Sequence, residues 1–99
     1  MEVVVKPYLF LRQVFGVNKV VLDLPEEANV QELLQVLRCD YGMPEKLNVA
    51  DGQLIFMDGY KPVGLTILVN GYNIKQLQGL YTTLNDGAVI SLFPPAAGG

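Results

Sequence analysis

The end of the chain carries the strongest candidate for covalent chemistry. The last seven residues have no ionisable side chain, so the C-terminal carboxylate of the final residue is the expected reactive group. Glycine has no Cβ, so a partner can approach its carbonyl closely, and two glycines in succession can enter a narrow channel. These seven residues are Phe93, Pro94, Pro95, Ala96, Ala97, Gly98 and Gly99. These residue types therefore predict that the carboxylate of Gly99 is the group that is activated, with Gly98 beside it.

The two prolines predict where the body of the protein ends. Pro94 and Pro95 have no N–H to donate, so they should end the strand before them. The residues that follow extend at most ~13 Å at about 3.3–3.6 Å each. We therefore expect a domain over residues 1–93 and a flexible tail over 94–99, long enough to reach a buried site. The alternative is an inert end, because glycine-rich and alanine-rich termini are often merely frayed.

Residue types exclude most other chemistry. The 99 residues form one domain and include one cysteine, Cys39, and no histidine. An internal disulfide, a cysteine-rich zinc site, an iron–sulfur cluster and a histidine-dependent triad are thus excluded. Cys39 is expected to be a half-buried structural thiol in a helix. There is no phosphate-binding glycine loop, so we expect no cofactor or metal on this chain and catalytic groups on its partners.

Charge and hydrophobicity narrow the class of partner. The net charge is −3 with seven scattered Lys and Arg, which argues against nucleic acid. The first residues carry an acid, Glu2, and no long apolar run, so we expect neither a signal peptide nor a membrane span, and a cytoplasmic location. Apolar residues make up 51% of the chain, so some must face outward and could dock a partner protein.

The first half of the chain predicts a hairpin and a helix. Runs over 3–15 and 19–24 indicate two strands, with Pro7 at a bulge or an unpaired position. Asn29 stands three residues before Glu32, a capping-box arrangement that begins a helix. Its apolar positions recur at helical spacing until Gly42, and they are Val30, Leu33, Leu34, Leu37 and Tyr41.

The second half predicts the rest of a sheet. Residues 44–49 are expected to form a helical turn and 53–57 a short strand. A strand over 65–69 then reaches Asn70-Gly71, a type I′ hairpin dipeptide, before a small return strand. A nearly all-apolar run over 88–93 is typical of a central strand. The predicted fold is α+β, a β-grasp (ubiquitin-like) domain with a mixed four- to five-stranded sheet and one main amphipathic helix on one face.

Alternation along the last strand singles out one aromatic residue. Val89, Ser91 and Phe93 share one face, opposite to Ala88, Ile90 and Leu92. We expect Phe93 to anchor a partner, since aromatic side chains are enriched among interface hot spots. The alternative is that Phe93 completes the core.

The C-terminal segments resemble a known family. The run from Val69 through the Asn70-Gly71 and Asp86-Gly87 turns to the Phe-Pro-Pro-x-Ala-Gly-Gly ending is similar to the ubiquitin-like sulfur carriers, and most of all to the small subunit of molybdopterin synthase. The segment from Tyr8 to Arg12 resembles the first strand of that family, and 29–42 resembles its helix. Ala88 and Ala96 depart from the family pattern, replacing an acid and a valine.

The resemblance implies a cycle driven by partners. An E1-like adenylating enzyme would use ATP to activate the Gly99 carboxylate, and a sulfur donor would convert it into a thiocarboxylate. The large subunit of molybdopterin synthase would receive the tail and direct its sulfur onto a pterin precursor of the molybdenum or tungsten cofactor. Residues 93–97 would bind these partners. Three alternatives stay open: a modifier joined through Gly99 to lysines, a carrier for thiamine or tRNA thiolation, and a binding module with an inert end.

Overall fold

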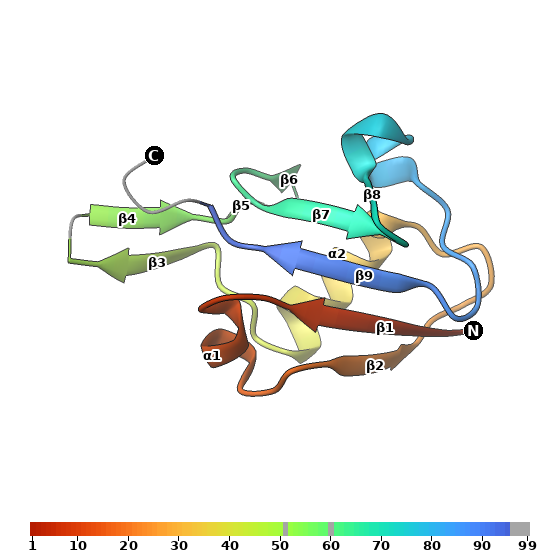
Figure 1. Ribbon diagram of the computed structural model, residues 1–99, viewed down its shortest axis with the longest axis horizontal. Coiled ribbons are helices and arrows are strands. Elements are labelled where there is room, and N and C mark those ends of the chain that lie inside the picture. Colours follow the sequence, from red (N-terminus) through yellow and green to blue (C-terminus); the bar gives the residue numbers. More distant parts are fainter. Residues whose placement is uncertain (51, 60, 96–99) are drawn as a thin grey trace.

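A five-stranded mixed sheet and one long helix form the body of the protein (Figure 1). The computed structural model describes residues 1–50, 52–59 and 61–95. The sheet has the order β2-β1-β9-β7-β8, in which β1 and β9 are parallel and the other neighbours antiparallel. Its strands are β1 (Glu2–Pro7), β2 (Val20–Asp23), β7 (Thr66–Val69), β8 (Tyr72–Asn73) and β9 (Val89–Phe93). The helix α2 (Val30–Asp40) lies across one face, so the predicted β-grasp fold and its central last strand are confirmed.

The helix α2 forms as its sequence pattern predicts. The Asn29 side chain accepts a hydrogen bond from the Glu32 N–H at 2.9 Å, which satisfies an otherwise unpaired donor of the first turn. Four of the five predicted apolar positions are fully buried: Val30, Leu33, Leu34 and Leu37. Tyr41 is instead the C-cap and is 42% exposed. Cys39 is exposed, so the prediction of a half-buried thiol is wrong; it lies off the buried stripe.

Replacing the helix cap should weaken the fold measurably. Asn29→Ala removes the acceptor for the Glu32 N–H and should lower the free energy of unfolding by about 1 kcal/mol. Urea denaturation followed by circular dichroism measures the loss. Gln31→Ala is the control, because Gln31 is the second residue of the helix and makes no capping bond; its free energy of unfolding should stay near that of the parent. Equal midpoints for both variants would show that the cap contributes nothing.

The N-terminal segment departs from the predicted long strand. β1 ends at Pro7, and a short helix α1 (Leu11–Phe15) occupies residues predicted to be strand. The helix buries Leu11 and ends at Gly16, whose left-handed conformation lets its N–H bond to the carbonyl of Arg12. The bulge or unpaired position predicted at Pro7 is also wrong, since Pro7 is paired with Leu92 of β9. Because Pro7 is the last residue of β1, paired with Leu92, its missing N–H interrupts no continuing strand.

The middle segment forms two small hairpins. They are β3 (Lys46–Val49) with β4 (Gly52–Ile55), and β5 (Met57–Asp58) with β6 (Lys61–Pro62). The helical turn predicted over 44–49 is therefore wrong, whereas the short strand predicted near 53–57 is present as β4. Phe56, between the hairpins, is fully buried and its N–H bonds to the Glu45 carbonyl at 2.7 Å. Packing of this aromatic ring into the core, rather than local helix propensity, determines the conformation of the middle segment.

The C-terminal third follows the prediction closely. Asn70 and Gly71 have φ angles of 51° and 88°, as a type I′ turn requires. The Asn70 side chain also accepts a hydrogen bond from the N–H of Val89 at 2.9 Å, which ties the turn to β9. After β8 the chain forms two short 3-10 helices, η1 (Ile74–Gln76) and η2 (Gly79–Tyr81).

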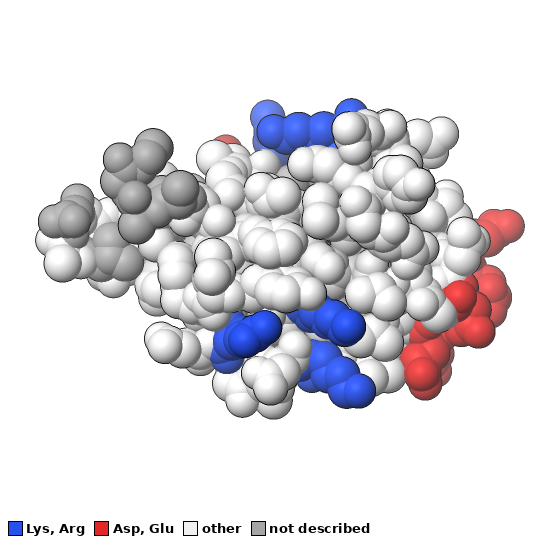
Figure 2. Space-filling model, in the orientation of Figure 1, with Lys and Arg blue, Asp and Glu red and all other residues white. Residues whose placement is uncertain are grey.

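Charge is unevenly distributed over the molecule. The amino group of Met1 lies 3.3 Å from Asp23 and 3.7 Å from Glu26. Burial alone would lower the pKa of this amino group, but its hydrogen bond to Asp23 and the charges of Asp23, Glu26 and Asp86 outweigh burial and raise it. Acidic residues gather at one end in Figure 2, and uncharged side chains cover the middle of the sheet. Within the described ranges, no helix is long and apolar enough to cross a membrane.

Candidate functional site

The central strand β9 separates a buried face from an open one. Ile90 and Leu92 are fully buried beneath α2, whereas Val89, Ser91 and Phe93 are half-buried on the opposite side of the sheet, here called the open face. The predicted alternation is thus confirmed, and Phe93 does not lie in the core under α2. Figure 1 shows α2 behind the sheet, so the side of the molecule facing the reader in Figure 2 is the open face.

Phe93 is held by an aromatic partner from the N-terminal segment. The rings of Tyr8 and Phe93 stack with centroids 4.6 Å apart and planes 9° from parallel. The guanidinium of Arg12 lies 5.5 Å from the centre of the Tyr8 ring, and its Nε donates to the Pro7 carbonyl at 3.3 Å. The arrangement gives Phe93 a fixed position and leaves part of its ring available on the open face.

The sequence contained a signal for this pair. Because β1 and β9 are parallel with Pro7 opposite Leu92, the next residues, Tyr8 and Phe93, come to lie side by side. The Tyr8 N–H bonds to the Leu92 carbonyl at 3.0 Å, which extends the parallel pairing by one residue. An aromatic residue just beyond each of two parallel strands could therefore have predicted the stack, once the strand order was known.

The start of the tail packs closely against the body. Pro94 is buried and Pro95 half-buried. A Cβ on Gly64 would lie 2.8 Å from the Ile55 carbonyl oxygen and 3.1 Å from the Cβ of Pro95. Only glycine fits at this position, so Gly64 allows the chain beyond β9 to pass alongside the loop before β7. We call the group formed by Tyr8, Gly64, Phe93, Pro94 and Pro95 the tail root.

Adding a Cβ at Gly64 should destabilise the protein more than backbone strain alone would. Gly64→Ala introduces a clash with Ile55 and Pro95 and strains a φ of 82°, so we expect a loss of about 2–4 kcal/mol in unfolding free energy from overpacking and strain together. Gly71→Ala is the matched control, because its φ is 88° and no atom lies within 4 Å of the added Cβ. Chemical denaturation compares the two. A Gly64 variant no less stable than the Gly71 variant would contradict the close packing.

The remaining predicted site residues lie beyond this group. The predictions for Ala96, Ala97, Gly98 and Gly99 fall outside the described residues. Within 1–50, 52–59 and 61–95, no cluster of three or more His, Cys, Asp or Glu could hold a metal ion. The described geometry can therefore direct and dock a chain end, using the rigid strand β9 and the aromatic stack beside it.

Comparison with known proteins identifies the family. The model of the ThiS family matches residues 10–99, which include Phe93, both prolines after it and the diglycine. This chain belongs to the ThiS family. It is a ubiquitin-like protein of the sulfur carrier and modifier class.

Some relatives of this chain are named as modifier proteins and others as subunits of a molybdopterin-converting factor. It is 32% identical to small archaeal modifier protein 3 of Haloferax volcanii, with the match covering 100% of both chains. The solution structure of small archaeal modifier protein 1 from Methanosarcina acetivorans has a TM-score of 0.71 at 29% identity, covering 99% of this chain and 96% of that one. The complex of subunits 1 and 2 of the molybdopterin-converting factor from Helicobacter pylori contains a chain with a TM-score of 0.59 at 25% identity, with both chains covered completely.

Proposed function

We propose that this protein carries sulfur as a thiocarboxylate on Gly99 and delivers it to a pterin precursor as the small subunit of a molybdopterin synthase. The observation that carries the proposal is the tail root, which lies where the central strand β9 ends, four residues before the diglycine, in a chain matched by the ThiS family up to Gly99. The likeness to a chain from a molybdopterin-converting factor complex supports the pterin as acceptor.

Activation of the tail requires a partner enzyme. A carboxylate is a poor electrophile, so an E1-like enzyme would join the Gly99 carboxylate to the α-phosphate of ATP and release pyrophosphate. A sulfur donor at the oxidation level of sulfide would then attack the acyl carbon, AMP would leave, and a thiocarboxylate would remain. Its anionic sulfur is a good nucleophile at neutral pH. The carrier contributes the reactive end and its position, which reduces the entropic cost of the transfer.

The open face supplies the docking surface in this proposal. Phe93 lies at the tail root, so a partner that binds its ring is placed where the chain leaves the sheet. Val4 and Val89 are paired in register on the same face and extend its apolar area away from Phe93. We propose that the activating enzyme and the large synthase subunit use this face in turn, while residues 94–97 enter the partner.

A second function is favoured by one comparison. The 32% identical relative is named a small archaeal modifier protein, so Gly99 of this chain is also a candidate for amide bond formation with lysines of target proteins. The activated carboxylate is shared by both functions, and only the nucleophile differs. A sulfur carrier for thiamine or tRNA thiolation would differ from the first proposal only in the acceptor.

Affinity purification from cells can separate the two functions. We expect a tagged chain to co-purify with a pterin-converting subunit and to show, by intact mass spectrometry, a terminal thiocarboxylate. A ladder of larger species, with Gly99 linked to target lysines in fragment spectra, would favour the modifier. A chain shortened by Gly98 and Gly99 is the matched control and should show neither product.

A further inference from the structure

One strand edge of the main sheet is left partly uncovered. β7 pairs with β9 along its whole length, but on its other side β8 pairs only with Leu68 and Val69. The Asn70 N–H donates to the Val89 carbonyl at 2.8 Å. Because successive residues of a strand direct their N–H groups to opposite sides, this bond shows which residues point toward β9 and which point away. Leu65 and Ile67 therefore direct their backbone N–H groups away from β9, and neither N–H has a hydrogen-bond partner among the described residues.

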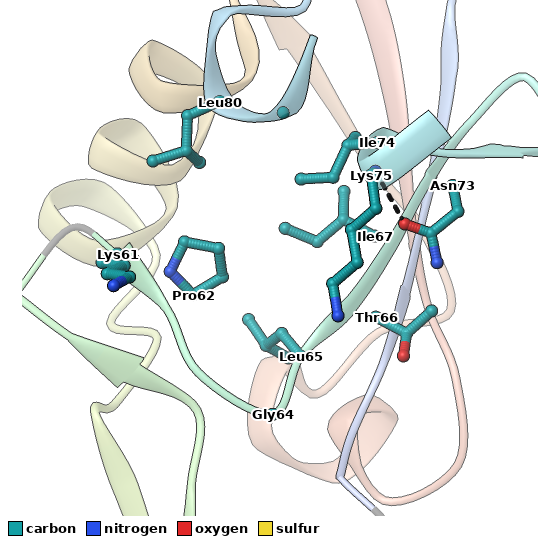
Figure 3. A pocket seen from close by; sticks show the side chains of 11 residues that line it. Lys61, Pro62, Gly64, Leu65, Thr66, Ile67, Asn73, Ile74, Lys75 and Leu80 are labelled. Carbon is teal, nitrogen blue, oxygen red and sulfur yellow. Dashed lines mark hydrogen bonds between the residues drawn. The ribbon is translucent and has the colours of Figure 1, made fainter. Parts of the chain in front are cut away.

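A pocket lies along this uncovered edge. Its volume is about 320 Å³, and it is enclosed by β6, β7, η1 and η2 (Figure 3). Leu65, Ile67 and Ile74 form a buried apolar floor, and Leu80 of η2 closes one side. A strand edge beside an apolar pocket offers both requirements for binding an extended peptide: backbone hydrogen bonds for affinity and a cavity for one side chain.

The rim of the pocket carries positive charge. Lys61 and Lys75 are exposed and lie on opposite sides of the pocket (Figure 3). Its described lining contains no aspartate or glutamate, although the protein as a whole has a net charge of −3. Nor does either lysine form an ion pair with another described residue. A ligand with carboxylates flanking an apolar side chain would complement this rim.

We propose that this edge binds an extended acidic segment of a partner protein by strand addition. The segment would pair with the N–H groups of Leu65 and Ile67, place an apolar side chain on the pocket floor, and set carboxylates against Lys61 and Lys75. A second copy of this chain fits less well, because two paired β7 edges would bring the same lysines together. Lys61, Leu65, Ile67 and Lys75 are not members of the tail root, so this edge would provide a point of attachment in addition to Phe93, whatever chemistry the tail performs.

A synthetic peptide probes the site directly. The probe is a fluorescein-labelled peptide that alternates glutamate and valine, added to the intact 15N-labelled protein. We expect amide shift changes centred on Leu65, Ile67 and Lys75. Lys61→Glu or Lys75→Glu should weaken binding about tenfold, as expected for losing an attractive charge and gaining a repulsive one. Lys19→Glu, an exposed lysine outside the pocket, is the matched control and should bind like the parent.

Changes in the probe test strand addition without altering the fold of the protein. N-methylation of alternate peptide amides should abolish binding, because a residue that donates its N–H to an added strand also accepts from that strand through its carbonyl, and methylation removes those peptide donors. Equal binding of a lysine–valine peptide, or shift changes centred on Phe93, would overturn the proposal. Concentration-dependent shifts at Leu65 and Ile67 without peptide would also overturn it, in favour of a second copy. A chain lacking Gly98 and Gly99 should bind the peptide as the parent does. Failure of the proposed tail chemistry can therefore be told apart from failure of peptide binding.

Discussion

A chain extended by one residue after Gly99 is expected to lose all activation by the proposed E1-like enzyme. The extension replaces the carboxylate of Gly99 with a secondary amide and moves the new carboxylate beyond the position to which the tail root directs it. Adenylation, followed as pyrophosphate release, should fall to the background rate. The fold should be unaffected, because the added residue follows the tail and not the body.

A cleavable extension provides the control for this result. The added segment is chosen so that a protease removes it directly after Gly99. We expect the uncut chain to be inactive and the cut chain to recover the parent rate, which attributes the loss to the chain end alone. An extended chain that still complements a deletion strain without being trimmed would show that the carboxyl group of Gly99 is not the working group.

Removal of the Phe93 ring is expected to weaken the binding of partner proteins. Phe93→Ala takes away an aromatic side chain that is fixed by Tyr8 and partly available on the open face, so partner binding should weaken by about 2 kcal/mol, or roughly 30-fold in Kd. Isothermal titration with the large synthase subunit or the E1-like enzyme measures the change. Because Phe93 is only half-buried, the loss of fold stability should be smaller than for a core phenylalanine such as Phe56.

The aromatic residue Tyr81 supplies a matched control for Phe93. It is 73% exposed on η2, away from β9, so Tyr81→Ala also removes a surface aromatic ring but should leave the Kd unchanged. Thermal unfolding of both variants identifies any contribution from misfolding. A folded Phe93→Ala variant that binds both partners like the parent protein would exclude the tail root from the docking surface.

The elements that the sequence predicts well are those determined by local chemistry. Asn29 caps α2 because its own side chain reaches the first turn, and Asn70-Gly71 forms a type I′ turn because both residues tolerate a positive φ. The two faces of β9 follow from simple alternation. None of these predictions needs information about distant parts of the chain.

The features that the sequence did not predict depend on tertiary contacts. The strand-like residues of α1 become helical because β1 ends at Pro7 and Leu11 packs into the core. β3 is a strand because β4 pairs with it, which the composition of 44–49 does not indicate. Gly64 is required because Ile55 and Pro95 approach it from distant segments, so no local pattern marks it.

The intact mass of the protein after incubation with an E1-like enzyme, ATP and a sulfur source shows whether Gly99 carries sulfur. We expect a mass increase equal to the replacement of one oxygen by sulfur, located on Gly99 by fragmentation and absent when ATP is omitted. An unchanged mass with an active partner, or sulfur found on any residue other than Gly99, would contradict it.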